Sequence, residues 1–123
     1  MRGMVMVGAL VLAGCAIGPA TMQMYGGLDG RWTVDLSTTP DEPYTKTMEL
    51  QLNADGTVTG SFYDSEIMAG RWKTDRGRTC VSFRTTDGAG PYHSAACRVG
   101  ERIEGQTWAE HRDFLFNWNA TRG

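Results

Sequence analysis

The fold of this chain is decided by residues 45–63, TKTMELQLNADGTVTGSFY. Apolar and polar residues alternate on both sides of residues 53–56, so Met48, Leu50 and Leu52 share one face of the first half. Alternation with a period of two is typical of a half-buried strand. The Asp-Gly pair in the middle supplies the positive φ that a tight turn between strands requires. The stretch therefore predicts a β-hairpin.

The same alternation recurs along the rest of the chain, with turn residues about every 8–12 residues, the spacing of a sandwich or barrel. No long stretch has a helical period, and short connections favour antiparallel neighbours. We predict an all-β domain, an eight-stranded antiparallel up-and-down (meander) barrel, because closure removes exposed sheet edges. A Greek-key sandwich is the rival fold. The expected strands are residues 31–36, 45–52, 57–63, 67–74, 78–85, 92–99, 102–109 and 114–122.

Composition limits the size and the partners of the protein. The chain has 123 residues, which suits one domain, and 41% of them are hydrophobic, which is enough for a core. Twelve Lys and Arg residues against 14 Asp and Glu residues give a net charge of −2. A general nucleic-acid binder carries a strong positive charge instead, so we expect no nucleic-acid partner.

The N-terminus has the pattern of a targeting segment. Arg2 precedes an uncharged run, residues 4–14, which has the length of a secretory hydrophobic region and is too short to cross a bilayer. Residues 12–15, LAGC, resemble the lipobox of bacterial lipoproteins. The resemblance implies cleavage before Cys15, a diacylglycerol on its sulfur and an acylated new amine. An ordinary secretory signal with a chance cysteine is the alternative.

This resemblance divides the chain into a signal peptide at 1–14, a lipidated cysteine and flexible tether at 15–27, and a barrel domain at 28–123. It places the protein in the bacterial cell envelope, anchored to the membrane by lipid. Aspartate after the cysteine is the inner-membrane retention signal of such lipoproteins in enteric-type bacteria. Because Ala16 stands there, the resemblance favours the outer membrane, with the domain facing the periplasm.

Once Cys15 is assigned to the lipid, two cysteines remain in a compartment that permits disulfides. If the strands at 78–85 and 92–99 form a hairpin about Gly88 and Ala89, Cys80 lies opposite Cys97. Directly opposed residues on neighbouring strands are close enough for a disulfide. We therefore predict a Cys80–Cys97 disulfide.

Gly30-Arg31-Trp32 on the first strand and Arg122 on the last resemble the calycin barrels, the group of lipocalins and avidins. The resemblance implies that Trp32 closes one end of the barrel and that Arg122 packs across it. A guanidinium on an indole ring is physically favourable. Residues 30–36, 56–63 and 118–122 resemble avidin strands in the right order. An avidin-like or lipocalin-like barrel is expected to bind a small molecule.

Two departures from the avidin pattern argue against biotin. Avidins hold the ureido oxygen of biotin with an asparagine and a tyrosine, and these positions correspond to Val34 and Phe62 here. Neither side chain can donate a hydrogen bond. We expect instead a small apolar ligand at a barrel mouth lined by some of the large aromatic residues, tentatively Phe62, Trp72, Trp108 and Trp118, together with Trp32. The same side chains could simply fill so narrow a lumen, and Trp108 could point outward.

Nothing in the sequence indicates an enzyme. His93 and His111 fall on different segments, no nucleophile-elbow motif occurs, and the disulfide leaves no His/Cys metal spacing. We therefore expect no catalytic residue, no metal and no cofactor.

Two other functions stay open. One is a protein-interaction module, such as a periplasmic protease or lysozyme inhibitor, that acts through the proline-containing loop at residues 37–44. The other is a structural envelope lipoprotein. Residues 71–84 contain five cationic side chains and a single acidic one, Asp75. They could form an ordinary solvated face or a patch that binds an acidic partner. The five cationic residues are Arg71, Lys73, Arg76, Arg78 and Arg84.

Overall fold

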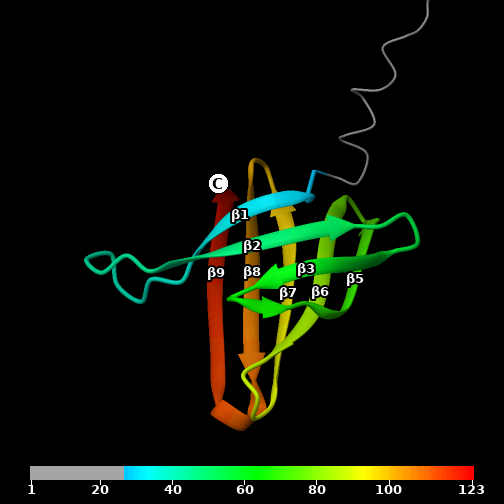
Figure 1. Cartoon of the computed structure of the whole chain (residues 1–123). Helices are drawn as coiled ribbons and strands as arrows, with labels where there is room; N and C mark the ends of the chain where they lie inside the picture. Colours follow the sequence, from blue (N-terminus) through cyan, green and yellow to red (C-terminus); the bar gives the residue numbers. More distant parts are fainter. Residues whose placement is uncertain (1–26) are drawn as a thin grey trace, which may run out of the picture.

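The structure is a computed structural model and describes residues 27–123. The predicted signal peptide and Cys15 lie outside the described residues. Within this described range the chain forms nine strands and one short 3-10 helix, whose arrangement Figure 1 shows. They are β1 (Gly30–Asp35), β2 (Thr45–Leu52), β3 (Thr57–Phe62), β4 (Ser65–Glu66), β5 (Met68–Asp75), β6 (Arg78–Thr86), β7 (Pro91–Val99), β8 (Arg102–Ala109), η3 (Glu110–Arg112) and β9 (Phe114–Arg122).

The strands form one closed antiparallel barrel. Each long strand pairs with its neighbours in the chain, and β1 also pairs with β9, which joins the last strand to the first. The two-residue β4 only extends the β3 edge, so eight strands make the wall. The predicted up-and-down barrel is confirmed, and the sandwich is wrong, because the pairing is continuous around the circle.

The chain between β3 and β5 differs from the predicted strand at 67–74. Tyr63 and Asp64 have positive φ, the short β4 follows, and Ile67 separates β4 from β5. Ile67 is 5% exposed and donates its amide to the carbonyl of Gly60 over 2.9 Å. The β5–β6 register then shifts between Met68 and Arg71. A bulge adds a residue on one strand only, and period-two alternation does not show where that happens.

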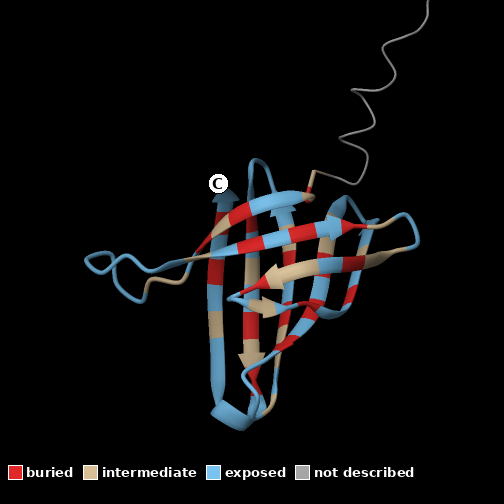
Figure 2. Cartoon of the chain, viewed as in Figure 1, coloured by how far each residue is buried: buried red, intermediate tan, exposed pale blue. Residues whose placement is uncertain are grey.

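Buried residues alternate with exposed ones along the strands, as the red bands in Figure 2 show. Successive side chains on a strand face opposite ways, so the buried set fills the barrel. At the centre, the ring of Phe62 lies 5.3 Å from that of Trp118 and 5.5 Å from that of Phe83. Gly105 on β8 makes room for the indole, because a Cβ there would lie 2.5 Å from Cη2 of Trp118. This part of the lumen is therefore core.

The disulfide and the register around it are confirmed. Cys80 and Cys97 are directly opposed on β6 and β7 and are bonded, and Val81 lies opposite Ala96 as the hairpin requires. Val81 and Ala96 are buried in the core. Because neighbouring residues on a strand face opposite ways, the disulfide lies on the outer wall.

Candidate functional site

One end of the barrel is closed by a tryptophan and an arginine. The Arg122 guanidinium lies over the Trp32 ring, 4.0 Å from its centroid, and donates to the backbone carbonyls of Gly27 and Asp29. The indole Nε1 of Trp32 donates to the carbonyl of Leu28 over 2.9 Å. The chain that enters the barrel is thus tied to the last strand, in the arrangement that the calycin resemblance implies.

The opposite end is a mouth that holds a cavity of about 530 Å³. It lies where β1, β3, β6 and β8 end and where β7 and β9 begin. Half of its lining residues are apolar or aromatic. They are Leu36, Phe62, Tyr63, Tyr92, Phe114 and Phe116.

These rings form a connected group around the mouth. Tyr92 meets Phe114 edge to face, with ring centroids 5.9 Å apart, and Phe114 is stacked with Phe116 at 6.2 Å. Phe62 reaches the cavity from below, where it belongs to the central core cluster. The filled core therefore forms the floor of the cavity, and only the mouth is open.

Hydroxyl groups form a polar layer beside this floor. Trp118 donates through Nε1 to Oγ1 of Thr107 over 2.9 Å, and Oγ1 of Thr107 lies 2.8 Å from Oγ of Ser94. All three residues are buried. Thr85 is also buried and lines the cavity, but no hydrogen bond joins its hydroxyl to any other group within residues 27–123.

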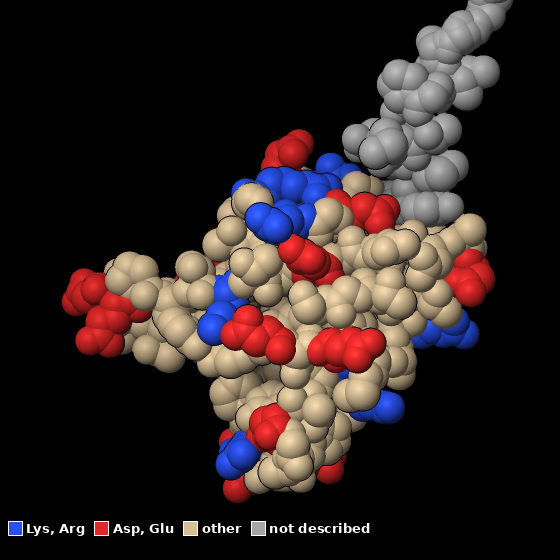
Figure 3. Space-filling model, viewed as in Figure 1, with Lys and Arg blue, Asp and Glu red and all other residues tan. Residues whose placement is uncertain are grey.

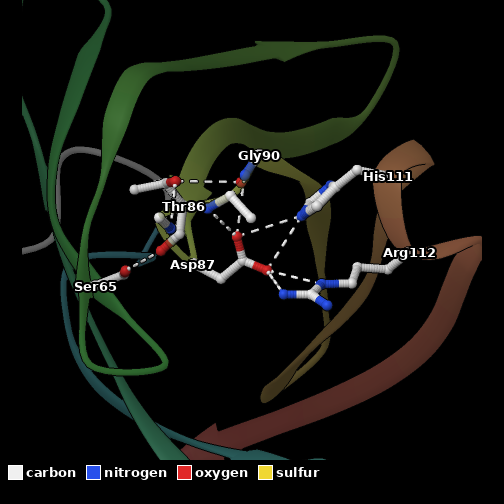
Figure 4. Close-up of polar contacts among 8 residues, drawn as sticks. Ser65, Thr86, Asp87, Gly90, His111 and Arg112 are labelled. Atoms are coloured by element: carbon white, nitrogen blue, oxygen red, sulfur yellow. Dashed lines mark hydrogen bonds and ion pairs between the residues drawn. The ribbon is translucent and has the colours of Figure 1, made fainter.

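An ionic latch fixes one side of the mouth (Figure 4). Asp87 accepts from the amides of Ala89 and Gly90, at 2.8 and 3.0 Å, in the β6–β7 turn. From the segment that joins β8 to β9, Nε of Arg112 donates to it over 2.9 Å and Nε2 of His111 lies 3.1 Å away. The backbone amide of Ala89 and the Arg112 guanidinium hold the pKa of Asp87 far below its usual range. The ionised carboxylate of Asp87 therefore ties the β6–β7 turn to the segment that joins β8 to β9.

The other side of the mouth carries a tyrosine pair. The hydroxyls of Tyr44 and Tyr63 lie 2.6 Å apart, and Lys46 lies over the Tyr63 ring, 5.2 Å from its centroid. Lys46 also pairs with Asp64 at 2.8 Å. The hydrogen bond with the Tyr44 hydroxyl raises the pKa of Tyr63 above its usual range.

Of the four aromatic residues predicted to bind ligand, only Phe62 lines the mouth cavity. Trp118 lies in the core below it, and Trp72 donates through Nε1 to the carbonyl of Asn53, over 2.7 Å, at the β2–β3 turn. Trp108 lies on the outer wall, stacked on His93 with ring centroids 5.5 Å apart. The structure agrees with the alternatives that the sequence left open, since Trp118 fills the lumen and Trp108 points outward.

Sequence reasoning missed most of the mouth. It assigns no role to Thr85, Tyr92, Phe114 or Phe116, all of which line the cavity. A signal was present, because Phe114, Phe116 and Tyr92 are aromatic residues near strand ends that meet at one end of a meander. It was not used because a period-two pattern gives the face of a residue and not its height in the barrel.

Charged residues occupy two further regions outside the mouth. Arg71, Lys73 and Arg84 are exposed on β5 and β6, and Lys73 pairs with Asp75 at 3.4 Å. The β1–β2 loop extends well away from the barrel, with acidic side chains at its tip (Figures 1 and 3). Both regions are exposed. Arg71 and Lys73 border a depression of about 500 Å³ on the outer wall, but Trp72 is the single aromatic residue of the described chain that lines it, so it lacks the ring of aromatic side chains found at the mouth.

Within residues 27–123 no group of three or more His, Cys, Asp or Glu side chains could hold a metal ion. The same part of the chain contains no helix with the length and apolar character needed to cross a membrane. Comparison with known proteins finds no matching protein-family model, no similar curated protein and no similar solved structure.

Proposed function

We propose that the protein is a binding module that takes up a small apolar ligand in the mouth cavity of its barrel. The observation that carries the proposal is a cavity of about 530 Å³ with six apolar or aromatic lining residues above a filled floor. Ligand pockets are typically concave, apolar and about 300–1,000 Å³, with a few polar groups that orient the ligand. The mouth has this composition.

The filled floor limits the ligand to a compact molecule. Phe62, Phe83 and Trp118 occupy the barrel centre, so a long chain has no channel to enter. Biotin stays an unexpected ligand, since Val34 and Phe62 are buried and offer no side-chain donor. Retention of the protein on biotin resin would contradict that expectation.

Two adjacent residues of β9 provide a matched test. Phe116 lines the cavity, whereas Leu115 is 64% exposed on the opposite face. The neutral dye N-phenyl-1-naphthylamine, which fluoresces in apolar sites, serves as the probe. Phe116→Asn should weaken its binding about tenfold, because a cavity wall becomes polar, and Leu115→Asn should leave it unchanged. Equal effects of the two variants, or no binding to the unaltered protein, would contradict the proposal.

We also propose that Cys15 is lipidated and anchors this module in the bacterial envelope. The support is the LAGC sequence after an uncharged run at residues 4–14. Two or three acyl chains hold a protein to a membrane far more firmly than one. Intact mass of the protein from its membrane fraction should show the acyl groups, and Cys15→Ser should release the protein or leave the signal uncleaved. An unmodified Cys15 in the mature protein would contradict this.

A protein-interaction role has one observation in its favour. The β1–β2 loop projects from the barrel (Figure 1) and carries Asp41 and Glu42, both exposed. Its base is ordered, since the Leu36 amide donates to the Tyr44 carbonyl over 2.8 Å. Such a loop fits a basic protein surface. If co-purification of an envelope protein is lost in an Asp41→Ala, Glu42→Ala variant while dye binding persists, the loop is a second functional site.

A further inference from the structure

We infer that the ligand is a neutral phenol, a molecule with a hydroxyl group on an aromatic ring, and that this hydroxyl group binds Thr85. This inference rests on the proposed function and specifies the ligand of the same cavity. Three features of the mouth carry it: a buried hydroxyl without a partner, an aromatic wall, and lining carboxylates that are already paired with cations.

The first feature is Thr85, which is 5% exposed and lines the cavity. The other two buried hydroxyl residues, Ser94 and Thr107, bond to one another, and Thr107 also accepts from an indole. Among residues 27–123 none bonds to the Thr85 hydroxyl. Buried polar groups in proteins normally have hydrogen-bond partners, so a group inside the cavity should supply the missing one.

The second feature is the aromatic lining that shares the cavity with Thr85, whose strand partner is Tyr92. Phe62, Tyr92 and Phe116 present aromatic rings to the cavity. Aromatic rings pack favourably against one another in edge-to-face or offset arrangements. A ligand with one ring and one hydroxyl therefore matches the composition of the wall better than a branched or purely polar molecule does.

The third feature is charge. The charged residues that line the cavity are Asp64 and Asp87, both carboxylates, and no Lys or Arg of the described chain is among the lining residues. Lys46 pairs with Asp64, and Arg112 pairs with Asp87, which His111 also faces. Among the described residues, the opening thus offers no unpaired counter-charge to an ionic ligand of either sign, and such a ligand would lose its hydration without compensation. The opening therefore favours a neutral ligand.

Three compounds with the same ring separate these features: p-cresol, toluene and 4-methylbenzoate. Calorimetric titration into the purified full-length protein should show p-cresol binding about five- to tenfold more tightly than toluene, because of one added hydrogen bond. The carboxylate should not bind measurably. Thr85→Val keeps the shape of the side chain and replaces its hydroxyl by a methyl group, so it should abolish the preference for p-cresol while toluene binds at least as tightly as before.

Thr59→Val is the matched control, since Thr59 is exposed on β3 and lies outside the cavity. It should keep the preference for p-cresol. If Thr85→Val also keeps it, or if 4-methylbenzoate binds as well as p-cresol, the inference is wrong while toluene binding still supports an apolar cavity. If neither p-cresol nor toluene binds the unaltered protein, the proposed function itself fails.

Discussion

Gly105 makes a sharp test of how the barrel is filled. It lies within β8 at a backbone conformation outside the positive-φ region, and an added Cβ would lie 2.5 Å from both Cζ2 and Cη2 of Trp118. Ordinary contact begins at 3.4 Å. The indole cannot move aside freely, because it packs on Phe62 and donates to Thr107. Gly105→Ala should therefore destabilise the protein by about 1–3 kcal/mol, the usual effect of overpacking.

The sign of this effect should reverse when the indole is removed. In a Trp118→Leu background the atoms that meet the new Cβ are absent. The same Gly105→Ala change then acts mainly by restricting the unfolded chain, which stabilises by about 0.4–1 kcal/mol. The two substitutions are coupled because they share one contact.

Urea unfolding followed by far-UV circular dichroism measures this in the four proteins of the cycle. A change of 1 kcal/mol corresponds to about 4–8 °C in melting temperature for a domain of this size, so thermal melts give a second reading. Gln106→Ala is the control, because Gln106 is exposed on the same strand. An equal loss from Gly105→Ala in both backgrounds would refute the reasoning, since it would place the strain in the backbone and not against Trp118.

Three other predictions concern the ties that hold the barrel. Replacing Cys80 and Cys97 by serine should lower the free energy of unfolding by about 2–4 kcal/mol, and a free-thiol assay that finds both cysteines reactive in the native protein would contradict the disulfide. Because the folded-state pKa of Asp87 is below its ordinary value of 3.8, its ionised form stabilises the protein above that pH and the contribution is lost as pH falls further. The melting-temperature difference between the unaltered protein and Asp87→Asn should thus shrink below pH 3.8, and a difference that stays constant would show that the latch is not electrostatic. Trp32→Ala should cost about 3–5 kcal/mol; if it and Arg122→Ala both leave melting unchanged, this end does not hold the barrel closed.

The fold was predictable because its information is local. Side chains on a strand alternate with a fixed period, and turn residues such as Asp55 and Gly56 mark where strands reverse. Once the β6–β7 turn is centred at Gly88 and Ala89, the pairing of every residue in that hairpin follows. The disulfide provides a test of that register, because it requires Cys80 and Cys97 to be directly opposed, and they are.

The bulge near β4 and the faces of the tryptophans could not be predicted from the local sequence alone. Ile67 is buried between β4 and β5 because the chain bends there, and Tyr63 before the bend has a positive φ that its residue type does not favour. Trp108 and Trp118 lie on consecutive strands, the first on the outer wall and the second in the core. Alternation allowed Trp108 to point outward but did not settle which face it takes. The difference depends on single-residue register across several strand pairs.

The site was harder to predict than the fold because it depends on height along the barrel axis. Phe62 and Phe116 both point inward, but the first is part of the floor and the second part of the open wall. In Figure 1, β8 and β9 run past β1 to reach η3, so the wall is taller on that side of the mouth. The cavity therefore lies above a core that is complete without it. The filled core provides the stability, and the residues around the mouth provide the binding surface. Substitutions such as Phe116→Asn and Thr85→Val should therefore alter binding while the barrel stays folded.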